Sequence, residues 1–311
     1  MKSFRRAQTG VVVGLMAMVV NVGVVQGVAG AAVSSPANPA TVARDAGDTD
    51  PHLPLTAQTL RWEAEKFAAA TRLMEQARKA WATQPSATQS LVTVQPSATP
   101  SLVTITPNFT DPGGGGGTPP SSAAFSQNQQ AQQTGYWCGP AAVSEALGQR
   151  SYSLSQTSAA SQLKTDATGT AWSGIYVSTS PSTGYPVADV MNNRTGSTWY
   201  VPISVSSTAT SADKTNYRTA LVTDVGNAGY PLIGDAWEHP YQDHLIGHPR
   251  SYEIYHWFDI YGYANSGADT LYEDSVYGAV SIGWSSSVLS AYSTMPSDTI
   301  VGMLGDRGYI W

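Results

Sequence analysis

Cysteine is nearly absent from this chain of 311 residues, which holds only Cys138. A single cysteine cannot form a disulfide within the chain, so its thiol implies intermolecular pairing, inert burial or reactivity. Charged residues are also scarce, at 12% of the chain against roughly 25% in an average soluble domain. The formal charge is −6 and no basic stripe interrupts the sequence. These features exclude the usual electrostatic footprint of a nucleic-acid-binding protein.

Long apolar runs are missing after the first thirty residues, and the run at the start is short for a membrane span. An apolar segment over 11–25 follows three basic residues and precedes the small residues Ala29, Gly30 and Ala31. This is the pattern of a secretory signal peptide. We therefore expect residues 1–31 to be removed and the protein to be secreted, either free or associated with the cell wall. No stable membrane anchor is expected.

Composition divides the remaining chain into four segments. Residues 32–58 form a flexible lead-in, 59–83 have the apolar spacing of an amphipathic helix, and 84–120 are a linker rich in Pro, Ser, Thr and Gly. The helix could dock on the globular domain, pair with another chain, lie on a surface or act as an inhibitory pro-segment. Residues 121–311 form the globular domain. The five-glycine run of the linker lacks the Gly-Lys-Ser/Thr ending of a phosphate-binding loop.

The globular segment changes character along its length. Helical spacing follows Cys138 and recurs over 154–163, 185–191 and 216–225. Strand-like runs then occupy 230–237, 252–263 and 270–277. Helices followed by antiparallel strands predict an α+β fold with two lobes and a cleft between them.

Cys138 lies where a helix is predicted to begin. Gly139 and Pro140 follow it, and proline suits the first helical turn because its missing N–H costs nothing there. The N–H groups and dipole at a helix start favour a thiolate, the nucleophilic form. The alternative is a small buried hydrophobe, the usual role of an unpaired cysteine.

A nucleophilic cysteine needs a base and a group that orients the base. His256 lies within a predicted strand, which fixes a ring better than a loop would, so we predict it as the base. Asp274, predicted on the next strand, could lie beside that ring and set its tautomer. Glu273 and Asp259 would face the other side of their strands, and we interpret them as ordinary polar residues.

Two further groups of polar residues leave alternatives open. The Cys138 N–H and the side chain of Gln132 or Gln133 could bind an oxyanion. A loop metal site is the second alternative, although its spacing is not that of the helical two-histidine zinc motif, and a plain polar loop is the default. Its residues would be His239, Asp243, His244 and His248. We expect no metal and no cofactor.

Several of these motifs together resemble the peptidase C-39-like family of the papain-like superfamily, which is related to the domains that cleave double-glycine leaders from bacteriocins. The resemblance rests on Gln132-x5-Cys138-Gly-Pro-Ala-Ala, Gly229-Tyr-Pro, His256-x5-Gly-Tyr and Tyr272-Glu-Asp274. It implies a papain-like cysteine peptidase fold, with a helical lobe followed by an antiparallel sheet. It also implies a nucleophile at Cys138, a base at His256, an orienting Asp274 and an oxyanion donor at Gln132. The membrane spans and ATPase of the exporter members are not expected here.

Three functions follow from these observations. The first is a secreted cysteine peptidase that acts on peptide or protein substrates through a covalent acyl-enzyme. The second is a cell-wall peptide hydrolase or acyl transferase on the same fold. The third is a non-catalytic exported binding module, which predicts that Cys138 is buried or unpaired with His256.

Overall fold

The computed structural model describes residues 119–179, 182–285 and 287–311, together with Ala57 and Arg61. The predicted signal peptide, the lead-in apart from Ala57, and nearly all of the linker lie outside these residues. Of the predicted helix over 59–83 only Arg61 is described, and it is helical and exposed. No helix within the described residues combines the length and the apolar character that a membrane crossing requires.

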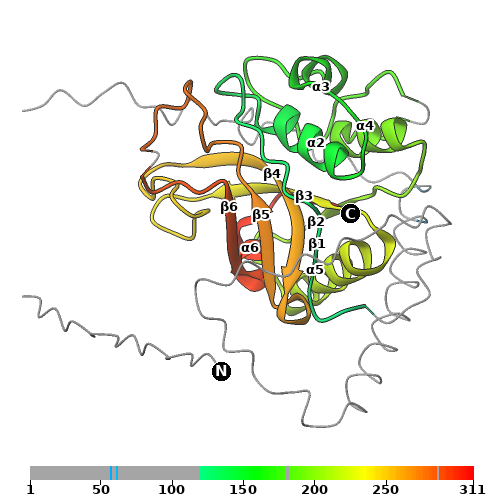
Figure 1. The fold of residues 1–311 in the computed structure, drawn as a ribbon, viewed down its shortest axis with the longest axis vertical. Helices are drawn as coiled ribbons and strands as arrows, with labels where there is room; N and C mark the ends of the chain where they lie inside the picture. Colours follow the sequence, from blue (N-terminus) through cyan, green and yellow to red (C-terminus); the bar gives the residue numbers. More distant parts are fainter. Residues whose placement is uncertain (1–56, 58–60, 62–118, 180–181, 286) are drawn as a thin grey trace, which may run out of the picture. The chain divides into compact units, whose positions relative to one another are not determined.

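A sheet of seven strands forms the centre of the described domain (Figure 1). Neighbouring strands are antiparallel in the order β2-β7-β3-β4-β5-β6, and β1 pairs with β4. The strands are β1 Ala123–Ala124, β2 Pro202–Ser204, β3 Leu232–Glu238, β4 Ile254–Ala264, β5 Asp269–Glu273, β6 Tyr292–Pro296 and β7 Gly308–Ile310. The longest strand, β4, is buried from Ile254 to Tyr263 and lies between β3 and β5.

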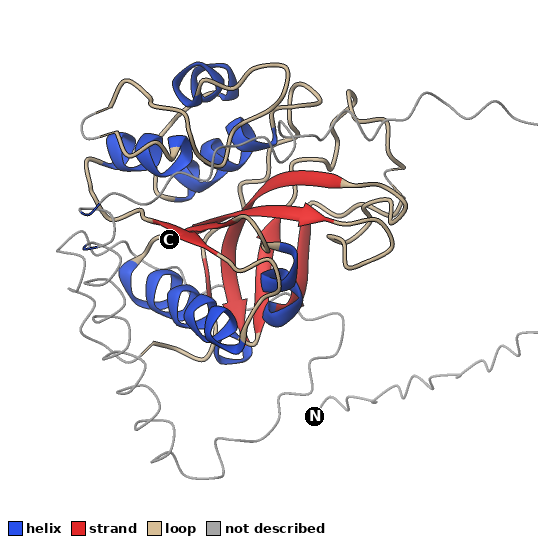
Figure 2. Ribbon diagram, turned by 180° about the vertical axis from the view of Figure 1, so that it is seen from behind, coloured by secondary structure: helices blue, strands red, loops and turns tan. Residues whose placement is uncertain are grey.

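Helices lie on both sides of this sheet, as the view from behind shows (Figure 2). The α-helices are α2 Cys138–Gln149, α3 Gln156–Leu163, α4 Pro186–Thr195, α5 Ser211–Thr223 and α6 Ser297–Met303. Residues 119–311 also contain two short helices, the π-helix η3 Asp224–Ala228 and the 3₁₀ turn η4 Asn265–Gly267. Helices α2, α3 and α4 pack together, and α2 also packs on β4.

Local sequence explains where several helices begin. The hydroxyl of Ser155 accepts a hydrogen bond from Ser158 N and caps α3. Thr210 and Asp213 form a capping box at the start of α5, each side chain bonding the backbone of the other residue. Pro186 occupies the first turn of α4, where its missing N–H leaves no bond unmade.

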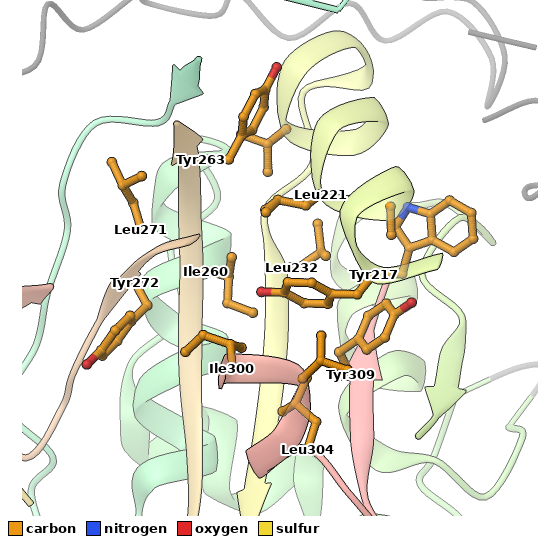
Figure 3. Packing of buried hydrophobic residues seen from close by; sticks show 14 of the residues in the cluster. Tyr217, Leu221, Leu232, Ile260, Tyr263, Leu271, Tyr272, Ile300, Leu304 and Tyr309 are labelled. Carbon is orange, nitrogen blue, oxygen red and sulfur yellow. The ribbon is translucent and has the colours of Figure 1, made fainter. Parts of the chain in front are cut away.

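The alternation of side chains along β4 separates the two larger apolar clusters of the core. Trp257 packs with Cys138 and the other apolar residues of α2, α3 and α4. Phe258 and Ile260 point to the opposite face and pack with α5 and α6. Figure 3 shows this second cluster, in which Leu221 of α5 and Ile300 of α6 meet side chains of β3, β4 and β7.

The α+β class predicted from the sequence is confirmed. The predicted helix over 154–163 and the strands over 230–237 and 252–263 match α3, β3 and β4 within two residues at each end. The fourth helix begins at Ser211, five residues before the predicted start. The predicted strand over 270–277 was wrong at its end, because β5 stops at Glu273. Asp274 therefore follows the strand and does not belong to it.

Candidate active site

Cys138 is the first residue of α2 and is fully buried. Pro140 lies in the first turn of the helix, as the sequence predicted. The side chain of Cys138 lies in the apolar cluster that includes Trp172 and Trp257. The burial of Cys138 is the property expected of a non-catalytic module. Its place at a helix start is the property expected of a nucleophile.

The structure brings His256 and Asp274 together. His256 Nε2 lies 3.1 Å from Asp274 Oδ1, and both side chains are buried. Val276 N donates to the same oxygen at 2.9 Å, which fixes the carboxylate from the other side. His256 Nδ1 is buried and has no hydrogen-bond partner within the described residues. The base and the orienting group thus form a pair.

Asp274 also contacts a second histidine that the sequence analysis did not assign to the site. His248 Nε2 lies 2.9 Å from Asp274 Oδ2, and His248 Nδ1 lies 2.8 Å from Glu238 Oε1. The other oxygen of Glu238 lies 2.8 Å from His244 Nδ1. We call these five residues the histidine–carboxylate chain: His256, Asp274, His248, Glu238 and His244. All of them are buried.

The charges in the histidine–carboxylate chain stabilise one another. Burial alone would lower the pKa of His248, but the carboxylates of Glu238 and Asp274 outweigh it and raise the pKa to about 10. Burial alone would raise the pKa of Asp274 and of Glu238, and the His248 imidazolium reverses both shifts, so each pKa lies below its ordinary value. At neutral pH, His248 therefore carries a proton between two ionised carboxylates.

Gln132 is buried beside the residue that follows Asp274. Its backbone N–H donates to Ser275 O at 2.8 Å, and Ser275 Oγ donates to Gln132 Oε1 at 3.1 Å. The amide nitrogen Nε2 donates to Thr134 O at 2.8 Å. One of the two amide hydrogens of Gln132 is therefore occupied, and the second is the one that would serve an oxyanion. Gln133 instead donates its backbone N–H to Gln156 Oε1.

The alternative loop metal site does not correspond to the observed contacts. Two of its residues, His244 and His248, are directed to Glu238. Within the described residues, potential ligand atoms of His248, His256 and Asp274 lie within 4.8 Å of one another. They are already joined by hydrogen bonds of 2.9 and 3.1 Å, whose protons fill the space between them. We assign no metal to this group.

Two loops meet beside the histidine–carboxylate chain, residues 239–253 after β3 and the described residues 275–285 and 287–291 after Asp274. The ring of Trp284 lies 4.9 Å from that of His248. At Gly247, which has φ +88°, a Cβ atom would lie 2.2 Å from Val288 O. Only glycine lets the two loops approach this closely. Val276, Ile282 and Leu289 of the second loop form a small apolar cluster with Ile254 of β4.

A second buried polar group, the carboxyl cluster, joins α2 to the sheet. It consists of Glu145 on α2, Asp259 on β4 and Glu273 on β5. Asn128 N donates to Glu273 at 2.6 Å, Gln130 N donates to Glu145 at 2.7 Å, and Gln149 Nε2 donates to Asp259. The second oxygen of each carboxyl group is buried and has no hydrogen-bond partner within the described residues.

The carboxyl cluster holds protons that ordinary carboxyl groups would lose. Burial, followed by repulsion from Glu273, raises the pKa of Glu145 and of Asp259 well above the ordinary range. Burial also raises the pKa of Glu273 to about 8. The interpretation of Asp259 and Glu273 as ordinary polar residues was wrong, because both are fully buried in this cluster. Their predicted direction, away from His256 and Asp274, matches the observed contacts.

One comparison with known proteins adds to this geometry. The model of the Peptidase_C39 like family matches residues 123–294, which include every residue of the histidine–carboxylate chain. The chain belongs to the Peptidase_C39 like family. Family membership supports a papain-like cysteine peptidase that acts on protein or peptide substrates. No curated protein matches the chain.

Within this family domain, sequence reasoning missed His248, Glu238 and Glu145. His248 follows His244 by four residues and Glu238 by ten, in a stretch with prolines and glycine that was interpreted as a polar loop. Glu145 stands between buried residues of α2, where an unpaired charge is unexpected. That isolated acidic residue on an apolar helix was the available signal for the carboxyl cluster.

Proposed function

We propose that this protein is a cysteine peptidase in which Cys138 is the nucleophile and His256 the general base. The observation that supports this proposal most is the hydrogen bond from His256 to Asp274, which leaves Nδ1 as the ring atom available to a thiol. Membership of a peptidase family and the place of Cys138 at a helix start add to it.

In the proposed reaction, the Cys138 thiolate attacks the carbonyl carbon of a peptide bond and the carbonyl oxygen becomes an oxyanion. The Cys138 N–H and the second amide hydrogen of Gln132 stabilise this oxyanion. The His256 imidazolium protonates the leaving amine, and a thioester forms on Cys138. His256 then takes a proton from water, whose oxygen attacks the thioester and releases the acid. Asp274 holds the ring throughout and does not react.

The predicted signal peptide supports secretion as part of the proposal. A secreted enzyme would meet extracellular proteins or the peptides of a cell wall, and the wall peptides remain the alternative substrate, by hydrolysis or by acyl transfer. Soluble peptides released from purified wall material would favour the alternative over cleavage of ordinary proteins.

A second candidate is supported by the burial of the site. Cys138, His256 and Asp274 are all fully buried, so the reacting atoms are closed to solvent. An exported binding module that keeps the family fold without its reaction would have the same property. Under the peptidase proposal, a substrate must open this arrangement before the thiol can attack.

The pH dependence of Cys138 alkylation by iodoacetamide separates the two candidates. A peptidase is expected to react well below pH 7, because a thiolate–imidazolium pair forms there, and His256→Ala should abolish this reaction. Cys138→Ser and His256→Ala should each reduce peptide cleavage by about 10³-fold or more. The control is His52→Ala, a histidine outside the family domain, which should change neither. A thiol that reacts only near its ordinary pKa of about 8.5, or not at all, would favour the binding module.

A further inference from the structure

His248 is placed to control Asp274 from the side opposite His256. It lies in the loop after β3, and both of its ring nitrogens face carboxylate oxygens, of Asp274 at 2.9 Å and of Glu238 at 2.8 Å. When both carboxyl groups are ionised, their oxygens only accept, so both nitrogens donate and the ring carries two protons. Contacts of this kind on both ring nitrogens fit an imidazolium at this position.

The contacts of Asp274 show what this imidazolium accomplishes. Oδ2 accepts from His248, whereas Oδ1 accepts from His256 Nε2 and from Val276 N. With both oxygens held, the carboxylate cannot rotate about its own bond without losing a charge-assisted hydrogen bond. The His256 ring therefore meets one fixed acceptor, which keeps its proton on Nε2 and leaves Nδ1 toward the reaction.

We propose that His248 is a positioning residue of this site, a permanent cation that holds Asp274 ionised and oriented so that Asp274 can fix the tautomer of His256. Glu238 is the counter-ion that keeps His248 charged. The inference rests on the proposed function, since positioning matters only if His256 acts on Cys138.

The surroundings of His248 contain no competing cation among the described contacts. The groups that face it are Glu238 from β3, Asp274 after β5, the His256 ring at 5.2 Å and the uncharged indole ring of Trp284. His244 contacts Glu238 on its other oxygen and does not contact Asp274. Together, His248, Glu238 and Asp274 carry a net charge of −1.

The first test reads the protons directly, in protein labelled with ¹⁵N at histidine. The wild type should show His248 doubly protonated at pH 7.5 and His256 with its proton on Nε2. In His248→Gln the amide can still donate to Asp274, but the charge is lost, and His256 should show a mixture of tautomers. His244→Gln is the matched control, because it removes a histidine from the same loop and the same Glu238 but leaves Asp274 untouched. It should keep the wild-type tautomer of His256.

The second test uses the reactivity of Cys138. Iodoacetate is anionic and is attracted by the proposed His256 imidazolium next to the thiolate, whereas iodoacetamide is neutral. The ratio of the iodoacetate rate to the iodoacetamide rate therefore falls at the pH where His256 loses its second proton. His248→Gln makes the net charge of the group −2, which should move the midpoint of this ratio up by about one pH unit. His248→Gln with Glu238→Gln restores −1 and removes the unpaired buried carboxylate. The double variant should fold and return the midpoint to the wild-type value.

The two tests separate failure of this inference from failure of the proposed function. A wild-type Cys138 without reactivity at low pH would contradict the peptidase, and the NMR measurement would still decide the role of His248. A neutral His248 ring in the wild type at pH 7.5 would overturn the inference. An unchanged His256 tautomer and an unchanged midpoint in folded His248→Gln would overturn it as well.

Discussion

The protein has two buried groups of carboxylic acids, one that includes Asp274 and one that includes Glu273. Their pKa values shift in opposite directions. In the histidine–carboxylate chain, imidazole rings alternate with carboxylates, and the pKa of Asp274 lies below its ordinary value. In the carboxyl cluster no cation is present among the described contacts, and the pKa of Glu273 rises to about 8. Adjacent residues with similar burial thus take opposite charge states because their neighbours differ.

The difference shows how the fold separates chemistry from support. Glu273 is the last residue of β5 and Asp274 follows it directly, and their side chains contact different groups, Asn128 N for Glu273 and the rings of His248 and His256 for Asp274. The group with Asp274 leads to His256 and the charges that a reaction would use. The group with Glu273 leads to α2, and its neutral carboxyl groups join this helix to the sheet without a permanent charge in the interface.

Of the variants that test this difference, Asp274→Asn should lower the free energy of unfolding most. The variant leaves the His248 imidazolium with one carboxylate in place of two and offers His256 and His248 a single acceptor oxygen. Breaking a buried charge pair in this way should cost about 3–5 kcal/mol in the free energy of unfolding at pH 7. Urea denaturation measures it, and Asp274→Ala should cost at least as much. A loss below about 1 kcal/mol would contradict the charged state assigned to the chain.

Glu273→Gln, one residue away, should change the free energy of unfolding in the opposite direction at high pH. In the folded state Glu273 keeps its proton up to a pKa of about 8, whereas in the unfolded chain it loses it near 4.5. Neutral Glu273 therefore contributes fully to the free energy of unfolding of the wild type below pH 4.5. This contribution falls by about 1.4 kcal/mol for each pH unit as the pH rises to about 8. The glutamine stays neutral, so the variant should be more stable than the wild type at pH 9 and similar to it at pH 5. Parallel stability curves for the two proteins would show that Glu273 titrates normally.

Gln149→Met should have the smallest effect. The variant keeps the packing volume of Gln149 but removes the donor to Asp259 in the carboxyl cluster. The loss of one hydrogen bond to a largely neutral acid should cost about 1 kcal/mol at pH 5. Because that donor also lowers the pKa of Asp259, the cost should grow at higher pH. Thermal unfolding at pH 5 and pH 9 would detect this, and a cost that shrinks with pH would contradict it.

The sequence predicted the elements that carry the proposed site better than the contacts within it. Helix α2 has apolar residues at helical spacing and strand β4 is a long apolar run, and the class and the pairing of His256 with Asp274 follow from the order of such elements. His248 could not be assigned, because its role depends on a loop that folds back to bring it beside Asp274, 26 residues later. Glu145 and Asp259 come together only when α2 packs on the sheet, and no local spacing encodes that distance.

The loop after Asp274 is closed at its base, and this has a consequence for how the protein can change. Asp274 N donates to Ala291 O at 3.1 Å, so the chain leaves β5 and returns to β6 through one backbone hydrogen bond. Between these points the loop reaches the surface, where Val280 is 96% exposed. The loop near Val280 can be made longer or shorter, or its residues exchanged, while the hydrogen bond at its base holds the Asp274 carboxylate in place. The exposed part of this segment can therefore vary in sequence without loss of the backbone hydrogen bond that holds Asp274 at the end of β5.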